Sequence, residues 1–330
     1  MRNVLAVLLT ALALLVSGCQ QDTFQLTESH RELVIYSDLN SSFIQALTEG
    51  FSRERNIGLR IMNLDQLDGS KQHADIVLTS HIILNQLAEA GSFEVLNLPA
   101  LDYIYDGYKD SHGYWAGVFY DSLTIVVNKE FSRKHGQVNI SGWQDLLKLP
   151  KCRIVVEHFD NSDLQRQILA AFASKMGERE VIDYFSSLRN KVVKYSKFSF
   201  TPLRMLVAGD ADIAVTLKSY AYGFAEDDFP AYLVEPKEGT PAVIYGAAIY
   251  KGSDSLDEAK DFVQWLLSSP SARKISLREE TGFNFIMPKG IPGPVVNSKK
   301  LWFNTVFLEQ KRLNGLVNKW YEKVRFKGLF

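Results

Sequence analysis

The sequence predicts an α/β protein of two lobes, each built on a mixed sheet, with two crossing strands that join them. Apolar runs typical of strands alternate with segments of helical spacing, which is the pattern of α/β domains. Two long extended apolar stretches, Trp115–Asn128 and Thr240–Tyr250, flank the block between them. A chain that leaves one lobe, builds a second and returns needs two such strands, and a hinge would lie there.

The N-terminus has the features of an export signal. Arg2 is followed by an apolar run from Val4 to Val16, shorter than the roughly 20 residues of a membrane-spanning helix. The small residues before Cys19 resemble the lipobox of bacterial lipoproteins, in which the signal is cut before a cysteine that then carries lipid. We therefore expect a signal peptide at 1–18 and a lipidated tether at 19–30, anchored to a membrane on the periplasmic side of the cell envelope. A plain cleaved signal with an incidental Cys19 is the alternative.

Composition supports a soluble globular body after the tether. The 330-residue chain is 46% hydrophobic and 23% charged, with a net charge of −1. Nothing in this charge balance favours nucleic acid as a partner. The expected division is a first lobe at 31–117 and 241–330, which includes C-terminal helices, and a second lobe at 118–240. Cys152 begins an apolar strand and is interpreted as a buried small hydrophobe.

Four predicted strand-to-helix junctions carry short polar residues. The first is LVIYSDLNSSFIQALTEGF, where Asn40, Ser41 and Ser42 can cap a helix. The second follows the strand Asp75–Leu78. Such a helix end presents free N–H groups to an anion.

The third and fourth junctions lie between the two crossing stretches. After the strand Ile154–Val156, Ser162 and Gln165 have capping-box spacing. In the fourth, Thr201 is the expected N-cap and Pro202 the first helical residue. Because ligands of open α/β sheets bind beyond the carboxyl ends of strands, the four junctions are expected to converge on one crevice.

The order of several segments resembles the bacterial extracellular solute-binding proteins of the ferric-iron, thiamine and phosphonate type. These segments are LVIYSDLNSSFIQALTEGF, ADIVLTSHIILNQLAEAG, YWAGVFYDSLTIVVNKE, SGWQDLLKLPKCRIVV, Ala208–Ile213 and GAAIYKGSDSLDEAKDFVQWLLSSPSARKI. The resemblance implies a type II periplasmic-binding-protein fold that closes on a small ligand and delivers it to an ABC transporter. It implies no cofactor and, most simply, a monomer.

The resemblance also indicates what the ligand is not. Ferric-binding members place a histidine, a glutamate and two adjacent tyrosines where this chain has Asn40, Ser80 and Ser219-Tyr220. Fe(III) prefers anionic oxygen ligands, and of this set only Tyr220 could supply one. Bare iron is therefore not expected. His81 lies one residue from the second position and is interpreted as a helix-surface histidine.

The remaining candidates are mostly neutral hydrogen-bond donors, which suit phosphate, phosphonate or carboxylate oxygens. They are Ser37, Asn40, Ser41, Thr79, Ser80, Asn161, Ser162, Ser199 and Thr201. Tyr220 and Tyr245 could stack on a ring or sugar, with core packing as the alternative. Asp38 and Asp121 are the candidates if the ligand has a cationic group. The expected ligand is a small anionic solute such as an organophosphate or phosphonate.

Two other functions can be weighed against transport. A ligand-sensing subunit for a membrane receptor kinase would use the same closure, and a ferric complex or a thiamine-like ligand remains an alternative cargo. An enzyme is not expected, although His158 near Asp160 could be drawn as an acid–base pair. The sequence has no nucleophile elbow, metal-ligand spacing or Walker-type loop.

Overall fold

The computed structural model describes residues 32–39, 41–67, 73–136, 138–149, 151–225, 230–278, 282–290 and 300–326. The predicted signal peptide, Cys19 and tether, and also Asn40, lie outside these residues. Within the described ranges, no helix combines the length and apolar character needed to cross a membrane.

The described residues form an α/β fold around a sheet of eleven strands, eight of which follow the order β2-β1-β3-β9-β4-β7-β5-β6. Strands β8 and β10 pair with β4, and β11 pairs with β9. The strands are β1 Glu32–Ser37, β2 Gly58–Asn63, β3 Ile76–Ser80, β4 Trp115–Asn128, β5 Ile154–Glu157, β6 Val192–Ser196, β7 Ile213–Leu217, β8 Ala231–Val234, β9 Thr240–Ile249, β10 Asn284–Phe285 and β11 Leu301–Trp302.

Helices connect most of these strands, as the alternating sequence pattern predicts. The α-helices are α2 Ser41–Arg55, α3 His81–Glu89, α4 Lys129–Lys134, α5 Trp143–Lys148, α6 Asp163–Met176, α7 Glu178–Leu188, α8 Thr201–Val207, α9 Lys218–Ala225, α10 Leu256–Ser268, α11 Pro270–Arg278 and α12 Gln310–Trp320. Short 3-10 turns lie at Leu64–Gln66, Pro99–Tyr103 and Asp106–Tyr108, and a π turn, η4, at Tyr321–Arg325.

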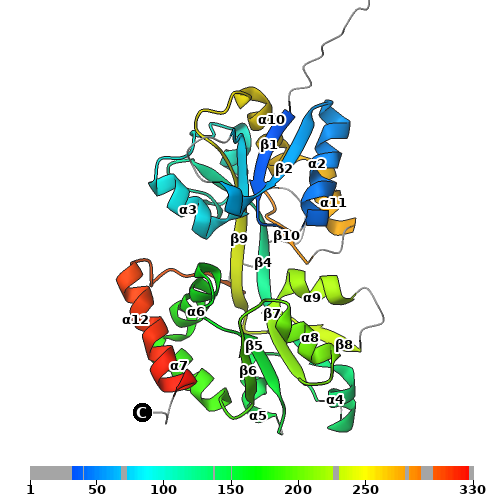
Figure 1. The fold of residues 1–330 in the computed structure, drawn as a ribbon, viewed down its shortest axis with the longest axis vertical. Helices are drawn as coiled ribbons and strands as arrows, with labels where there is room; N and C mark the ends of the chain where they lie inside the picture. The colour runs from blue at the N-terminus through cyan, green and yellow to red at the C-terminus, as the bar shows by residue number, and fades with distance from the viewer. Residues whose placement is uncertain are drawn as a thin grey trace, which may run out of the picture. The chain divides into compact units, whose positions relative to one another are not determined.

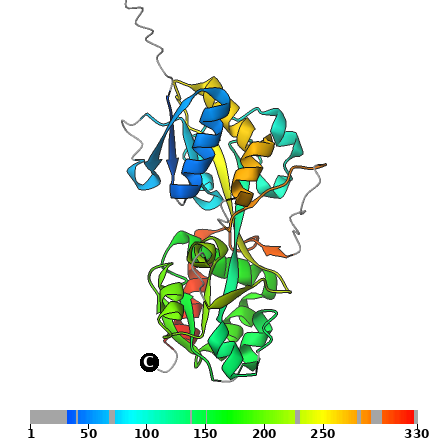
Figure 2. The same ribbon diagram turned by 90° about the vertical axis from the view of Figure 1, so that its right-hand side faces the viewer.

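The two predicted crossing strands are β4 and β9, which run side by side between two sections of the sheet (Figures 1 and 2). The first section contains β2, β1 and β3, which are parallel. The second contains β7, β5 and β6, also parallel. Strand β4 pairs with β9 through Trp115–Ser122 and with β7 through Leu123–Val127. The structure therefore has one continuous mixed sheet where two sheets joined by crossing strands were predicted, because β4 changes its partner along its length.

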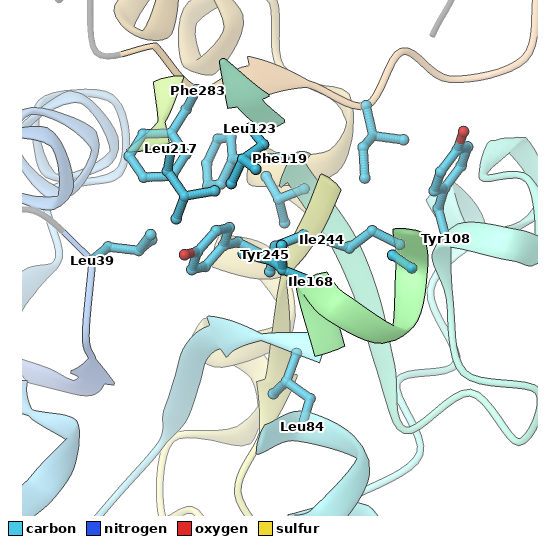
Figure 3. Close-up of a cluster of buried hydrophobic side chains, with 14 of the residues drawn as sticks. Leu39, Leu84, Tyr108, Phe119, Leu123, Ile168, Leu217, Ile244, Tyr245 and Phe283 are labelled. Atoms are coloured by element: carbon cyan, nitrogen blue, oxygen red, sulfur yellow. The ribbon is translucent and has the colours of Figure 1, made fainter. Parts of the chain in front are cut away.

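Helices pack on each section of the sheet. Helix α2 contacts β2 and α11 beside the first section, and α8 contacts β5 and β7 beside the second (Figure 1). Aromatic rings join distant segments at the centre, because Phe283 stacks on Phe43 at 5.1 Å between ring centroids and lies edge-on to Tyr245 at 5.4 Å. Figure 3 shows Phe283 and Tyr245 in one buried cluster with Leu39, Leu217 and Phe119.

The C-terminal helix packs on a different part of the chain from the one predicted. Helix α12 contacts α6 and α7, which belong to the block at 118–240, rather than the elements of the predicted first lobe. Its buried face includes Leu313, Leu316 and Trp320. The Trp320 ring lies edge-on to Phe159, 5.6 Å away, at the loop that follows β5. An amphipathic pattern predicts that a helix packs, but it does not identify its neighbour.

Candidate functional site

The candidate site is the group of polar side chains around the carboxyl ends of β1, β3 and β5 and the start of α9. We call it the junction site and define it by Asp38, Asp121, Glu157, Tyr220 and Tyr245. The carboxyls of Glu157, Asp121 and Asp38 all lie near enough to Tyr220 to raise its pKa, although burial of the phenol is the larger cause. These five side chains come from strands and loops far apart in sequence, which the fold brings together.

At the first junction the polar groups serve the local fold. Ser37 is buried at the end of β1, where its Oγ donates to the Leu78 carbonyl at 2.7 Å and accepts from the Leu39 amide at 3.1 Å. Ser37 therefore ties β1 to β3. Helix α2 begins at Ser41, within the stretch of predicted capping residues, and the Ser41 side chain lies outside what the structure describes.

Asp38 is exposed immediately after Ser37. The protein atoms that crowd its carboxyl raise its pKa, and the neighbouring Thr79 hydroxyl partly opposes that shift. The Asp38 carboxyl therefore lies close to Thr79 at the second junction. It can accept a hydrogen bond from a ligand or pair with a cationic group.

At the second junction Ser80 is the N-cap residue of α3, but its side chain makes no capping hydrogen bond. Ser80 and Thr79 are both buried. Because an N-cap side chain normally satisfies one amide of the first turn, α3 begins without that protection. This junction therefore keeps the donors that an anionic group could use.

His81, the first residue of α3, is half-buried rather than a surface histidine. Its Nδ1 lies 3.2 Å from the Ile244 carbonyl, and its ring lies 6.4 Å from that of Trp115. Burial lowers the pKa of His81 to about 4, although the Ile244 carbonyl opposes the shift. The ring is neutral at pH 7, and its Nδ1 can donate to that carbonyl.

At the third junction a buried carboxyl organises the loop, and sequence reasoning did not identify it. Glu157 ends β5 and is 5% exposed. Its Oε1 accepts from Ser199 Oγ at 2.9 Å and from Asn161 Nδ2 at 3.4 Å. Burial raises the pKa of Glu157 more than these two donors lower it. The signal in the sequence that could have identified Glu157 is its position as the acidic residue that ends the apolar run IVVE.

Two predicted site residues therefore meet at one carboxyl, and a third caps a helix. Asn161 also donates to the Lys197 carbonyl. Ser162 is the N-cap of α6, where its Oγ accepts from the Gln165 amide at 3.3 Å. At the fourth junction Thr201 is the first residue of α8 rather than its N-cap, which is Phe200. Helix α8 begins one residue earlier than the prediction because Pro202 is tolerated throughout the first turn.

Asp121 faces the start of α9 and is fully buried, with 0% exposure. One carboxylate oxygen accepts from the amides of Ser122 at 2.8 Å and Ser219 at 3.2 Å, and the other accepts from Ser219 Oγ at 2.6 Å. Burial raises the pKa of Asp121 to about 7, and the donors of Ser219 and Ser122 oppose the shift. These bonds give Asp121 a clear local role as the cap of α9.

Two tyrosines complete the junction site. Tyr220 is 41% exposed on α9, whereas Tyr245 is 8% exposed on β9. Burial raises the pKa of Tyr245 well above its ordinary value, and the nearby Asp121 and Asp38 carboxyls add to the shift. Both phenols keep their protons at neutral pH and can donate hydrogen bonds. Among the described residues, no group of three or more His, Cys, Asp or Glu side chains could hold a metal ion.

Two further residues that the sequence singled out, Cys152 and His158, make structural contacts. Cys152 is buried, and burial raises the pKa of its thiol. The His158 ring packs edge-on against Trp320 at 4.8 Å, and its Nδ1 accepts from the Asp160 amide at 3.2 Å. The His158–Asp160 contact is thus made through the backbone and not as an acid–base pair of side chains.

Comparisons with known proteins identify the family. Residues 71–285 match the model of the bacterial extracellular solute-binding proteins. An uncharacterized protein of Haemophilus influenzae is 31% identical over 191 residues, which are 56% of this chain and 55% of that protein, so the match spans about half of its length. The Fe(3+)-binding periplasmic protein of Serratia marcescens is 22% identical over 81% of this chain and 82% of its own.

A solved structure supports the same fold. The periplasmic binding protein AfuA from Actinobacillus pleuropneumoniae, with fructose-6-phosphate bound, aligns with a TM-score of 0.70. The two share 23% sequence identity, and the alignment covers 89% of this chain and 98% of AfuA. The arrangement of strands and helices is thus that of a type II periplasmic binding protein.

Proposed function

Because the chain belongs to the bacterial extracellular solute-binding proteins, a family without enzymatic activity, we propose that it captures a small solute at the junction site and delivers it to an ABC transporter. The observation that carries this proposal is the grouping of Tyr220 and Tyr245 with three carboxyls from separate segments, two at junctions and one on β4. In the proposed mechanism the ligand binds to one lobe, and the other rotates onto it by bending at β4 and β9.

The proposed ligand is a small organophosphate or phosphonate that also carries hydroxyl groups. Its anionic group would bind at the open start of α3, where Ser80 makes no capping bond. Its hydroxyls would donate to the carboxyls of Asp38 and Glu157, and the phenols of Tyr220 and Tyr245 would donate to its oxygens. The likeness to a protein that holds fructose-6-phosphate supports such a ligand without establishing it for this chain.

A ligand with an amino group is the second candidate, because the junction site has three carboxyls. Asp38 is exposed and could pair with an ammonium group, whereas Asp121 already accepts three hydrogen bonds. The remaining predicted ligand residues, Ser37, Asn40, Ser41, Thr79, Asn161, Ser162, Ser199 and Thr201, stay proposals.

Native mass spectrometry of the freshly purified protein, followed by a thermal-shift screen, tests the ligand class. The screen would contain sugar phosphates, phosphonates, inorganic phosphate, thiamine, amines and ferric complexes. We expect sugar phosphates to give the largest shift, equivalent to about 2.7 kcal/mol at a hundredfold excess over Kd. Amines as the best ligands would favour the second candidate. Stabilisation by ferric ion alone, with a tyrosinate colour, would contradict both.

Matched variants place the ligand in the junction site. Tyr220→Phe and Glu157→Gln should weaken binding of the best compound, while Lys251→Ala, which alters an exposed lysine beyond the end of β9 and outside the junction site, should not. Equal affinity in all three variants would place the ligand elsewhere.

We also propose that Cys19 carries the lipid anchor. The wild-type protein should fractionate with membranes and gain the mass of a lipid, and Cys19→Ala should abolish both. A wild-type protein that is released without lipid would indicate a plain cleaved signal. Co-purification of the loaded protein with a permease rather than a receptor kinase would support transport over sensing.

A further inference from the structure

A cavity of about 270 Å³ lies beside the crossing strands, apart from the junction site. Its polar lining comes from six segments of the chain: Tyr120 and Ser122 of β4, Lys218 at the start of α9, Glu235 after β8, Thr240 of β9, Asn284 of β10 and Lys300 before β11. Because side chains alternate along a strand, Tyr120 and Ser122 face away from the side that Asp121 presents to Ser219. The two hydroxyl side chains of the cavity on β4 therefore point to the face of β4 opposite Asp121.

Two lysines and one glutamate line this cavity. Lys218 Nζ pairs with Glu235 Oε1 at 2.5 Å and lies 5.6 Å from the Tyr222 ring centroid. That pair neutralises one of the two lysines. Lys300 forms no ion pair with any residue that the structure describes, so the cavity has an excess of one positive charge.

The position of Lys300 is set by its backbone. Its carbonyl accepts from the Thr240 amide at 2.8 Å, and β11 then pairs with β9 through Leu301 and Thr240. Gly239 has a φ of +101°, and a Cβ there would lie 2.6 Å from the Lys300 carbonyl oxygen. Only glycine allows this close approach, which holds the base of the Lys300 side chain against β9.

Neutral donors with spare capacity also line the cavity. The hydroxyls of Tyr120 and Ser122 make no hydrogen bond within the described part of the chain. Burial raises the pKa of Tyr120 to about 12, and the Glu235 carboxylate adds to the shift. The Tyr120 phenol therefore keeps its proton and remains a donor. Side-chain hydroxyls and an unpaired ammonium group are a donor set suited to oxyanions.

We propose that this cavity is a second binding site, separate from the junction site, for a small oxyanion such as a carboxylate or a phosphate. Lys300 would supply the charge, and Tyr120 and Ser122 would donate hydrogen bonds. Lys218 would stay paired with Glu235 and form the wall of the site. The inference does not depend on the identity of the transported solute.

Amide chemical shifts of the isotope-labelled protein test this site, with succinate and inorganic phosphate as separate probes. We expect saturable shifts at the amides of Ser122, Lys218, Thr240 and Asn284 with at least one probe. Lys300→Ala should raise the Kd about tenfold, and Lys300→Glu should raise it further because it reverses the charge. Lys251→Ala is the matched control, because it removes another exposed lysine without altering the cavity.

Tyr220→Phe separates the two sites, since it changes the junction site and leaves the cavity lining intact. Shifts at the cavity amides that survive Tyr220→Phe and weaken with both Lys300 variants would support the proposal. The absence of saturable shifts with either probe would overturn it, and so would equal affinity in the wild type and Lys300→Glu. Shifts abolished by Tyr220→Phe would assign the probe to the junction site instead.

Discussion

Asp121 and Glu157 are two buried carboxyls of one site, yet their partners differ in kind. Asp121 accepts from two backbone amides and from Ser219 Oγ, all beside β4 and the start of α9. Among the described residues, Glu157 accepts only from the side chains of Asn161 and Ser199, which lie on loops. Backbone donors are fixed by the fold, whereas side-chain donors can rotate. The comparison indicates that Asp121 maintains the site and that Glu157 is available to exchange partners with a ligand.

The strongest test of this difference is Asp121→Ala. The change leaves the amide and hydroxyl of Ser219 without their buried acceptor, so we expect the free energy of unfolding to fall by about 3 kcal/mol at pH 6. Urea unfolding monitored by circular dichroism measures the loss. A loss no larger than that of Glu157→Ala would remove the distinction between the two carboxyls.

Asp121 should also make stability depend on pH. Its pKa is about 7 in the folded chain against 3.8 for the ordinary group, so the folded chain binds this proton more tightly. The stabilisation from that proton is complete below about pH 4 and is lost as the pH rises to about 7, by a few kcal/mol. Urea unfolding across this range measures the slope. Asp121→Asn should flatten this part of the curve, and an unchanged slope would assign the dependence to other groups.

Glu157→Gln tests whether Glu157 binds the ligand, as the comparison with Asp121 predicts. The amide retains the size and one acceptor oxygen, so we expect the free energy of unfolding to change by less than about 1 kcal/mol. Affinity for the best compound of the screen should fall about tenfold, because the charged acceptor is lost. Calorimetric titration measures the affinity. A large loss of stability with unchanged affinity would make Glu157 a structural residue like Asp121.

The smallest expected effects separate the two serine N-caps. Ser162→Ala removes the acceptor of the Gln165 amide and should cost about 1 kcal/mol of stability. Ser80→Ala should cost less than about 0.5 kcal/mol, since Ser80 makes no capping bond, yet it should weaken binding of an anionic ligand. Thermal unfolding with and without the ligand measures both. Equal costs for the two changes would show that Ser80 caps α3 in solution.

Sequence patterns predicted the strands well and the polar contacts poorly. The predicted stretch Trp115–Asn128 has the same bounds as strand β4, because a long apolar run that joins two blocks of the chain is typical of an extended strand. Glu157 was missed because an acidic residue at the end of a strand usually faces solvent, and only the fold buries it. The capping roles of Ser80 and Ser162 could not be separated, since residue type does not determine side-chain rotation. The elements on which α12 packs are determined by shape complementarity, which the periodicity of the sequence does not predict.

The pairing of β3 with β9 has a consequence for how the chain reaches its folded state. Ile76 pairs with Ile249, so one edge of β3 stays without its partner strand until most of the polypeptide has been made. Contacts between residues so distant in sequence slow folding, because the long intervening loop must be ordered first. A chain that is exported through a narrow channel benefits from this delay. In a member of an extracellular family, late pairing of β3 with β9 would leave time for export before the sheet is complete.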